Sequence, residues 1–521
     1  MSAGALRTGG SNPRGREITA PQLKPSALVG KAWRDRATWA VRGIGPPSVP
    51  IAIPGNDDDV SQQHARAVLD LALRIGEAAL STGASAADVV ATVLRVTSAY
   101  GVKSTSVDIT YTSISVSMQR GMREDPLAVM RVIKARSMDF TRLEGLQRLV
   151  DDLSTSSRNQ AKGHPSVARP PQPRVEEARA RLSDILTAPH PYRRWIVTLG
   201  MALTAIGVVV LFGAGPTMWI VAGLSAAAVD RAQRLLFRLG VASFFSQVVS
   251  AAIPSTIAVA LFWISSSADG GGTLPGPNID IPGLDTPSLV VVSGIIVLLA
   301  GLSVMGAAQD ALDGYYVTAG ARGLEVVMMT LGIAVGVAVV LAVANAAGVA
   351  LIVQPDVADR TTVLSGTIGA MIVAVGFCLT HYTGPRATLV AAVMSGVGWL
   401  TFRFCSELTV EQPAASAAAA AVVGALAYAV HHRLRVPELV ISTAAIVALL
   451  PGLAVYRAIF LVMLDSAEFL GLAAVQLLTA LSVGLGLAAG LSIGGYLARR
   501  RFGLDPSAWR ARRRSLGAFQ D

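Results

Sequence analysis

Few polar side chains interrupt the apolar stretches that dominate this chain beyond residue 190, and these few could do chemistry within a bilayer. Two carboxylates, Asp310 and Asp313, stand three residues apart and therefore share one face of a helix. They could bind a substrate ammonium group or carry a coupling proton, or they could form an interfacial pair near Arg322. We predict them as proton-coupling residues or as a gate.

Uncharged polar residues form a second group of candidates. Gln247, Ser250 and Ser255 lie in one apolar run, and Gln476 lies in the last one. Because polar groups are costly in hydrocarbon, each is a candidate for lining a substrate path. Hydrogen bonding between helices is the alternative role for Gln247 and Ser250.

The pair Pro451-Gly452 lies inside another apolar run. Proline removes one helical hydrogen bond and glycine loosens the next turn, which frees backbone groups at membrane depth. A broken helix could offer these groups to the carboxylate or ammonium group of a zwitterion, whereas a simple kink is the alternative. We therefore add Pro451 and Gly452 to the predicted substrate path.

Signatures of enzymes and metal sites are missing from the sequence. It contains no Gly-x-x-x-x-Gly-Lys loop, no His-Glu-x-x-His and no Cys-x-x-Cys. One Gly-x-Ser-x-Gly match, at 490–494, lies inside an apolar run instead of at a strand-to-helix turn. The two cysteines, Cys378 and Cys405, are predicted to be small core residues. We expect no catalytic residue, no cofactor and no bound metal.

The composition of the chain places these candidates in a membrane. The 521 residues are 52% hydrophobic and only 15% charged, with a mean hydropathy of +0.53. Lysine is confined to the first part of the chain and does not occur beyond Lys162. The net charge of +10 could indicate a nucleic-acid partner, but the arginines beside the apolar runs lie at the ends of those runs and not in a basic patch. This pattern is typical of membrane-helix flanks and argues against nucleic acid as a partner.

The sequence divides into a polar N-terminal part and a membrane part. Residues 1–61 are rich in proline and are predicted to be a disordered tail without a cleaved signal. Residues 62–190 have the pattern of a small cytoplasmic α+β domain. Its predicted elements are helices at 62–83 and 85–100, two strands within 105–118, a helix at 138–153, a proline-rich linker at 162–173 and an amphipathic helix at 174–186.

About ten apolar stretches follow, each near the ~20 residues that span a bilayer. They lie at 195–213, 215–232, 241–265, 287–309, 323–347, 362–382, 386–404, 413–431, 436–459 and 469–497. Their arginine-rich flanks all fall on one side, which is then cytoplasmic, and the acidic loop 265–288 faces outward. Both termini, including a tail at 501–521, are predicted to be cytoplasmic.

The two halves of this region carry similar short motifs at corresponding positions. Gly215-Pro216 corresponds to Gly384-Pro385, and Leu298–Leu302 corresponds to Leu449–Leu453. Each half, 191–349 and 350–500, has five predicted spans, so the second must enter the membrane in the opposite orientation. Inverted five-helix repeats are typical of secondary transporters. Coincidence among common apolar residues is the alternative. Glycines at four-residue spacing predict close helix packing, with sliding surfaces as the alternative.

The stretches 73–84 (LRIGEAALSTGA) and 107–114 (VDITYTSI) resemble the N-terminal domain of the threonine/serine exporter family. The resemblance extends over about residues 62–500 and implies a mostly α-helical inner-membrane exporter of threonine and serine driven by the proton motive force. Its partners would be a small amino acid, the lipid bilayer and a proton. Ala300-Gly301 departs from the Pro-Gly expected there.

Two alternatives from other classes remain open. The first is a membrane-anchored enzyme or regulatory protein acting through residues 62–190, although ten spans exceed what an anchor needs. The second is a passive channel, which sequence does not separate from a coupled carrier. A homo-oligomer is also possible.

Overall fold

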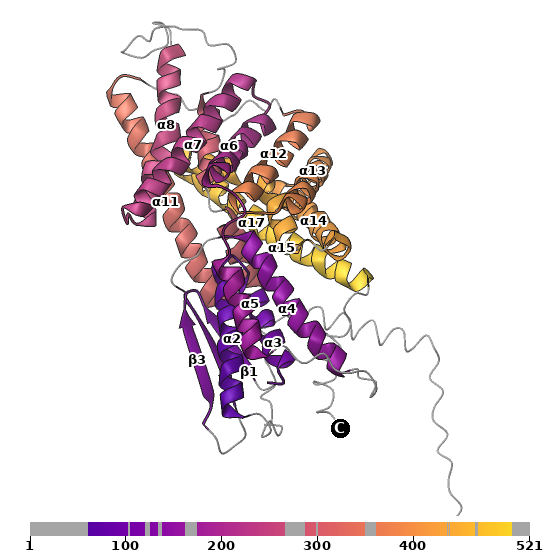
Figure 1. The fold of residues 1–521 in the computed structure, drawn as a ribbon. Coiled ribbons are helices and arrows are strands. Elements are labelled where there is room, and N and C mark those ends of the chain that lie inside the picture. Colours follow the sequence, from indigo (N-terminus) through magenta and orange to yellow (C-terminus); the bar gives the residue numbers. More distant parts are fainter. Residues whose placement is uncertain are drawn as a thin grey trace, which may run out of the picture. The chain divides into compact units, whose positions relative to one another are not determined.

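We describe the fold from a computed structural model that covers residues 61–102, 105–119, 125–133, 138–161, 174–265, 287–298, 301–349, 361–434, 436, 438–463 and 467–502. The predicted tails, the proline-rich linker and nearly all of the predicted outward loop lie outside these residues. Within the described parts the protein is mostly helical, with one small sheet (Figure 1).

The N-terminal domain begins with two helices, as the sequence predicts. They are α2 (Gln62–Ser81) and α3 (Ala86–Ala99). The hydroxyls of Ser61 and Ser85 accept hydrogen bonds from backbone N–H groups in the first turns, so both serines act as N-caps. Gly83, between the helices, has φ +105°, a conformation that favours glycine and ends α2.

Three antiparallel strands follow in the order β1-β2-β3. They are β1 (Thr105–Thr110), β2 (Ser113–Met118) and β3 (Leu127–Val132). The alternation in β2 places Ile114, Val116 and Met118 on the buried face. The sequence predicted the first two strands but not β3, an edge strand with no fully buried residue.

Two further helices complete the domain: α4 (Phe140–Ala161) and α5 (Val175–Thr187). Both were predicted, α4 with an earlier end. On α5, Val175, Ala178 and Leu182 are buried at helical spacing, and α5 packs against α2 and α4. The apolar core of the domain continues into the membrane part, because Phe377, Ala391 and Val440 belong to the same buried cluster.

The membrane part consists of long apolar helices. They are α6 (Arg194–Leu211), α7 (Pro216–Arg238), α8 (Ser243–Ser265), α9 (Ser288–Leu298), α10 (Gly301–Leu312), α11 (Tyr316–Ala346), α12 (Val363–Thr380), α13 (Pro385–Glu407), α14 (Gln412–Leu434), α15 (Glu438–Ile446), the 3₁₀ turn η1 (Val447–Leu449), α16 (Gly452–Met463) and α17 (Ala467–Phe502).

Seven of the described helices are long and apolar enough to cross a bilayer, or up to nine if each bent pair counts as one span. Nine of the ten predicted stretches meet this criterion when each bent pair counts as one span. The tenth, 215–232, lies in α7, which does not meet it because its second half carries Asp230, Arg231 and Arg234.

Two spans are bent in the middle. The helices α15 and η1 meet α16 at 44°, with Pro451 at the break, as the sequence predicted. The pair α9 and α10 is bent by 45°, although the sequence has no proline there. A side chain added at Gly452 would lie 2.4 Å from Ile296 of α9, so the start of α16 packs tightly on α9.

Glycines bring several helices into backbone contact, which confirms the predicted close packing. A Cβ atom at Gly486, Gly490 or Gly494 of α17 would lie 2.0–2.6 Å from carbonyl oxygens of α14. Gly332 and Gly336 of α11 approach α8 in the same way. Such contacts are typical of small residues at four-residue spacing.

Candidate functional site

The predicted substrate-path residues are distributed over several helices. Ser250 is fully buried on α8, and Gln247 lies on the same helix beside Gly332 of α11. Ser255, also buried, donates a hydrogen bond to the carbonyl of Ala251 in its own helix. These polar groups therefore lie within or beside helix contacts.

The helix α9 lies between the two proline elements of the membrane part. Its Gly294 approaches Pro254 of α8, because an added Cβ atom would lie 2.6 Å from the proline ring. Its Ile296 lies equally close to Gly452. Gln476 is half-buried on a different helix, α17. The structure thus places Pro254 and Gly452 against α9, and no contact among the described residues brings Gln476 to them.

Asp310 joins the membrane part to the N-terminal domain. Its side chain is fully buried and forms an ion pair with Arg322 of α11, with 2.9 Å between Oδ2 and Nη1. Its Oδ1 accepts a hydrogen bond of 3.1 Å from the backbone N–H of Ala86, at the start of α3. A carboxylate at a helix N-terminus is favoured by the helix dipole. The interfacial pairing that the sequence left open for Asp310 is therefore present.

One face of α11 contacts the domain over about two turns. Thr318, Arg322 and Glu325 recur at helical spacing and share that face. The Thr318 hydroxyl donates to the carbonyl of Ile109 at 3.3 Å, and Arg322 Nη2 donates to the carbonyl of Ala84 at 3.5 Å. Glu325 accepts a hydrogen bond from the hydroxyl of Tyr111. Side chains of this one helix face thus contact the domain at three points.

The length of α11 explains how it reaches the domain. Its 31 residues span about 46 Å at 1.5 Å per residue, whereas the hydrocarbon core is about 30 Å thick. The first turns, which carry Arg322 and Glu325, can therefore lie outside the hydrocarbon. Charged residues there avoid the cost of burial in lipid.

The domain contacts the second half of the membrane part at another point, the loop His381–Gly384 between α12 and α13. The backbone N–H of Phe140 donates to the carbonyl of His381 at 3.0 Å. The ring of His190 stacks on Tyr382 with centroids 4.3 Å apart. Tyr382 has φ +57°, an uncommon conformation for a residue other than glycine. The domain is therefore attached to both halves of the membrane part.

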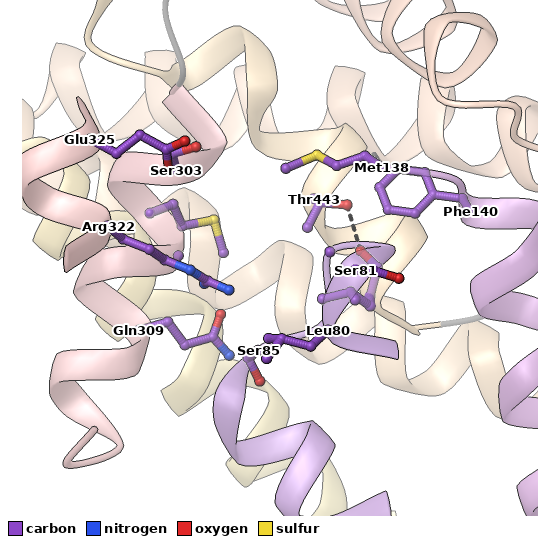
Figure 2. Close-up of a pocket in the computed structure, with 14 residues that line it drawn as sticks. Leu80, Ser81, Ser85, Met138, Phe140, Ser303, Gln309, Arg322, Glu325 and Thr443 are labelled. Carbon is purple, nitrogen blue, oxygen red and sulfur yellow. Dashed lines mark hydrogen bonds between the residues drawn. The ribbon is translucent and has the colours of Figure 1, made fainter. Parts of the chain in front are cut away.

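A cavity of about 200 Å³ lies where these contacts meet. Figure 2 shows Arg322 extending into it from α11, with Glu325 of the same helix nearby. Its lining comes from the domain, from α10 and α11, and from α15: Leu80, Ser81, Gly83, Ser85, Met138, Phe140, Ser303, Met305, Gly306, Gln309, Arg322, Glu325, Leu439 and Thr443. The cavity thus combines one guanidinium group, one carboxylate, several hydroxyls and an apolar remainder.

Gly306 allows the guanidinium group of Arg322 to lie against α10. A Cβ atom at this position would be 2.8 Å from Nη1 of Arg322, the same nitrogen that contacts Asp310. Any side chain here would move the guanidinium group away from that contact.

Asp313 lies at the turn between α10 and α11, close to the domain. Burial, followed by the negative charges of Asp88 and Asp310, raises its pKa to about 6. Asp313 therefore changes charge near neutral pH, unlike an ordinary aspartate.

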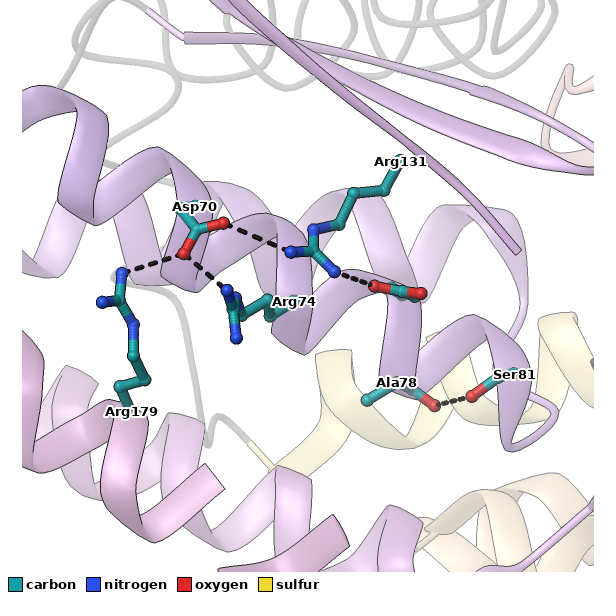
Figure 3. Close-up of polar contacts among 7 residues, drawn as sticks. Asp70, Arg74, Ala78, Ser81, Arg131 and Arg179 are labelled. Carbon is teal, nitrogen blue, oxygen red and sulfur yellow. Dashed lines mark hydrogen bonds and ion pairs between the residues drawn. The ribbon is translucent and has the colours of Figure 1, made fainter. Parts of the chain in front are cut away.

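Inside the domain, an ionic cluster centred on Asp70 of α2 ties separate elements together (Figure 3). Its carboxylate contacts Arg74 at 3.0 Å, Arg179 of α5 at 2.8 Å and Arg131 of β3 at 3.4 Å. Arg131 also contacts Glu77 at 2.8 Å, and this hydrogen bond raises the pKa of Arg131. The cluster therefore fixes the edge strand and α5 to α2.

Sequence reasoning missed several residues of the cavity. Arg322 was noted only as a flanking charge, and Glu325, Ser81 and Thr443 were not singled out. A usable signal exists: Arg322 and Glu325 are opposite charges three residues apart at the start of an apolar run. Their partners in the domain are more than 200 residues away in sequence, so spacing alone does not reveal them.

The fold and this junction define a multi-pass membrane protein whose small α+β domain is attached to the ends of its helices. Residues 70–344 match the family described as "Putative threonine/serine exporter", and residues 366–496 match "Threonine/Serine exporter, ThrE". The chain belongs to the threonine/serine exporter family.

Two curated relatives support this assignment. A "Probable threonine/serine exporter" of Mycobacterium tuberculosis is 34% identical over 452 residues, which cover 85% of this chain and 78% of the relative. A "Threonine/serine exporter" of Corynebacterium glutamicum is 30% identical over 461 residues, 87% of this chain and 86% of the relative. No solved structure matches the chain. The relatives are named as exporters and not as enzymes.

Proposed function

We propose that this protein exports threonine and serine across the inner membrane, coupled to proton movement, with the N-terminal domain and both termini in the cytoplasm. The mechanism depends on two inverted repeats, 191–349 and 350–500, each with five membrane helices when α7 counts as the second span of the first half. This arrangement is supported by the way equivalent helices pack in the two halves.

The first helices of the two halves, α6 and α12, pack against each other and run antiparallel. Gly200 of α6 approaches Gly376 and Thr380, whereas Gly207, further along α6, approaches Gly369 and Val373, earlier in α12. Opposite directions for equivalent helices are what an inverted repeat requires.

The third and fifth helices of each half also correspond. Gly332 and Gly336 of α11 face Phe244 and Val248 of α8, so these two helices run parallel. In the second half, Gly486 and Gly490 of α17 face Pro413 and Ala417 of α14, again in parallel. The bent pairs α9–α10 and α15–α16 occupy the fourth position in each half. This correspondence favours repeats over coincidence.

Within this arrangement we place the substrate path along the bent helices. Gln247, Ser250, Ser255, Pro451 and Gly452 lie on or against the helices that pack around α9 and α16. Gln476 of α17 stays part of the proposed path without a contact that links it to them. Movement of the bent helices would open the path alternately to each side.

For proton coupling we favour Asp313 over Asp310. Asp310 forms an ion pair with Arg322. The pKa of Asp313, raised to about 6, instead suits exchange of a proton near neutral pH. Asp310 then serves as the gate.

Counterflow of labelled L-threonine in proteoliposomes tests the proposal, with and without an imposed pH gradient. Coupled export predicts saturable exchange without a gradient and net concentrative movement with one. Net flux without saturation would indicate a passive channel, and no flux with folded protein would favour a regulatory or enzymatic role for the domain.

A further inference from the structure

We infer that the cavity between the N-terminal domain and the helices α10, α11 and α15 is a capture site for a free zwitterionic α-amino acid, and that occupation of this site releases the domain from α11. The inference rests on the proposed export function and assigns the first binding step on the cytoplasmic side. Three features of the cavity support it.

Its charges match those of a zwitterion. An α-amino acid carries a carboxylate and an ammonium group on the same carbon, so a site for it needs one cation and one anion close together. Arg322 and Glu325 are three residues apart on one helix, which places their Cβ atoms about 5–6 Å apart. Both side chains line the cavity (Figure 2). A guanidinium group can also bind a carboxylate through two parallel hydrogen bonds.

Its size and remaining lining favour small hydroxylated side chains. About 200 Å³ is below the 300–1,000 Å³ typical of sites for drug-sized ligands. Ser303 and Thr443 line the membrane side of the cavity. The Thr443 hydroxyl donates to the carbonyl of Leu439 at 2.6 Å, so its oxygen can accept a hydrogen bond from a side-chain hydroxyl. Phe140 and Leu439 add apolar surface. Threonine and serine fit this combination better than large or charged amino acids.

The site is directly connected to the contact that holds the domain. Arg322 pairs with Asp310, and Asp310 accepts the hydrogen bond from Ala86 at the start of α3. A substrate carboxylate that binds Arg322 competes with Asp310 for the guanidinium group and with the carbonyl of Ala84. A substrate ammonium group competes with the Tyr111 hydroxyl for Glu325. Binding therefore competes with two contacts between the domain and the membrane part, at Ala84 and Tyr111, and with the Arg322–Asp310 pair that supports the contact at Ala86.

Release at this point matters because the domain is attached to both halves. One attachment is to α10 and α11 in the first half, and the other is to the loop His381–Gly384 in the second. A rigid domain fixed at both points resists relative movement of the halves. Substrate binding at the first attachment would remove this restraint only when cargo is present.

The test measures L-threonine binding to the purified full-length protein in nanodiscs by calorimetry, with two analogues that each lack one charge. N-acetylthreonine lacks the ammonium group and threonine amide lacks the carboxylate. We expect each to bind wild-type protein at least tenfold more weakly than threonine. Equal affinity for threonine and both analogues would overturn the inference, and no variant is needed for this result.

Variants then assign the charges to residues. Glu325→Gln keeps an acceptor for Tyr111 but loses the charge, so threonine affinity should fall at least tenfold, to the level of N-acetylthreonine. The double variant Asp310→Asn with Arg322→Gln removes both charges of the buried pair and should abolish discrimination between threonine and threonine amide. Glu407→Gln on α13, a carboxylate with a 62% exposed side chain that pairs with Arg403, is the matched control and should bind normally. Unchanged affinity in Glu325→Gln would overturn the assignment.

Hydrogen exchange of the peptide 84–90, at the start of α3, reports the release. Saturating threonine should accelerate exchange there in the wild type and in Glu407→Gln. Slower or unchanged exchange on binding would overturn the release step. Counterflow separates this inference from the proposed function. If the wild type shows normal counterflow and Glu325→Gln has an unchanged KM, only the capture site is rejected. If the wild type shows no counterflow, the export function is rejected.

Discussion

Replacing Asp310 by alanine should detach the start of α3 from the membrane part. The substitution removes a fully buried carboxylate that accepts a hydrogen bond from Ala86 and pairs with Arg322. It leaves a guanidinium group that is only 10% exposed facing the positive end of the α3 dipole. The loss therefore affects docking of the domain as well as the pair itself.

The magnitude follows from the contacts that are lost. A hydrogen bond to a charged group contributes about 1.5–3 kcal/mol. A carboxylate at a helix N-terminus contributes about 0.3–1 kcal/mol more. Docking at α3 should thus weaken by about 2–4 kcal/mol, which corresponds to local opening that is roughly 30- to 1,000-fold more frequent. Asp310→Asn keeps an acceptor for Ala86 and should lose about half of this free energy.

Hydrogen exchange at residues 84–90 measures the opening directly, because exchange in native proteins follows local unfolding and detachment. The variants should exchange in the order Asp310→Ala, then Asp310→Asn, then wild type. Asp230→Asn is the matched control, since Asp230 is also buried and paired with an arginine, Arg234, but lies on α7. Folded Asp310→Ala protein with wild-type exchange at 84–90 would refute the role of Asp310 in docking.

Three further predictions concern single positions. Gly306→Ala should displace Nη1 of Arg322 and accelerate exchange at 84–90 as Asp310→Ala does, because its Cβ atom would lie 2.8 Å from that nitrogen; unchanged exchange would show that the arginine can adjust. Burial, followed by the negative charges of Asp88 on α3 and Asp310 on α10, raises the pKa of Asp313 to about 6. Asp310 is itself paired with Arg322 of α11. Protonated Asp313 therefore stabilises docking of the domain, and this stabilisation is lost as pH rises through about 6. Spin labels on α3 and α11 in a cysteine-free background should report tighter docking at pH 5 than at pH 7.5, and Asp313→Asn should flatten that dependence; the same slope in the variant would assign it to another group. Gly490→Ala should lower the free energy of unfolding by about 1–3 kcal/mol, because its Cβ atom would lie 2.1 Å from the carbonyl oxygen of Ala417. Gly471→Ala is the control and should leave stability unchanged, because nothing lies within 4 Å of its Cβ atom. Equal melting temperatures for the two variants would contradict the tight α14–α17 contact.

Much of the membrane part follows from sequence because of a single physical constraint. Backbone groups in hydrocarbon must be satisfied within the segment, so long apolar runs are predicted to be helices. Pro451 predicted the break between α15 and α16 because proline removes a helical hydrogen bond. Glycines at four-residue spacing likewise predicted the close contact of α17 with α14.

Other features were decided by tertiary packing. The bend between α9 and α10 occurs without a proline. The strand β3 was missed because it is an edge strand whose residues are at most half-buried, so its apolar pattern is weak. The helix α7 was predicted as a span from its apolar first half, and only the structure shows that Asp230 and Arg234 pair in its second half.

The capture site depends most strongly on the tertiary structure. Asp310 and Arg322 could be singled out as costly charges near a helix end, since burial of a charge has a cost wherever it occurs. Their roles depend on Ala86, 224 residues from Asp310, and on Tyr111, 214 residues from Glu325. Local propensity and periodicity determine which helices form, but contacts between residues so distant in sequence are fixed only when the domain and the helices pack together. The sequence therefore determined the membrane helices and the charges at their ends, and the packing of the domain on α10 and α11 decided that these charges form one site.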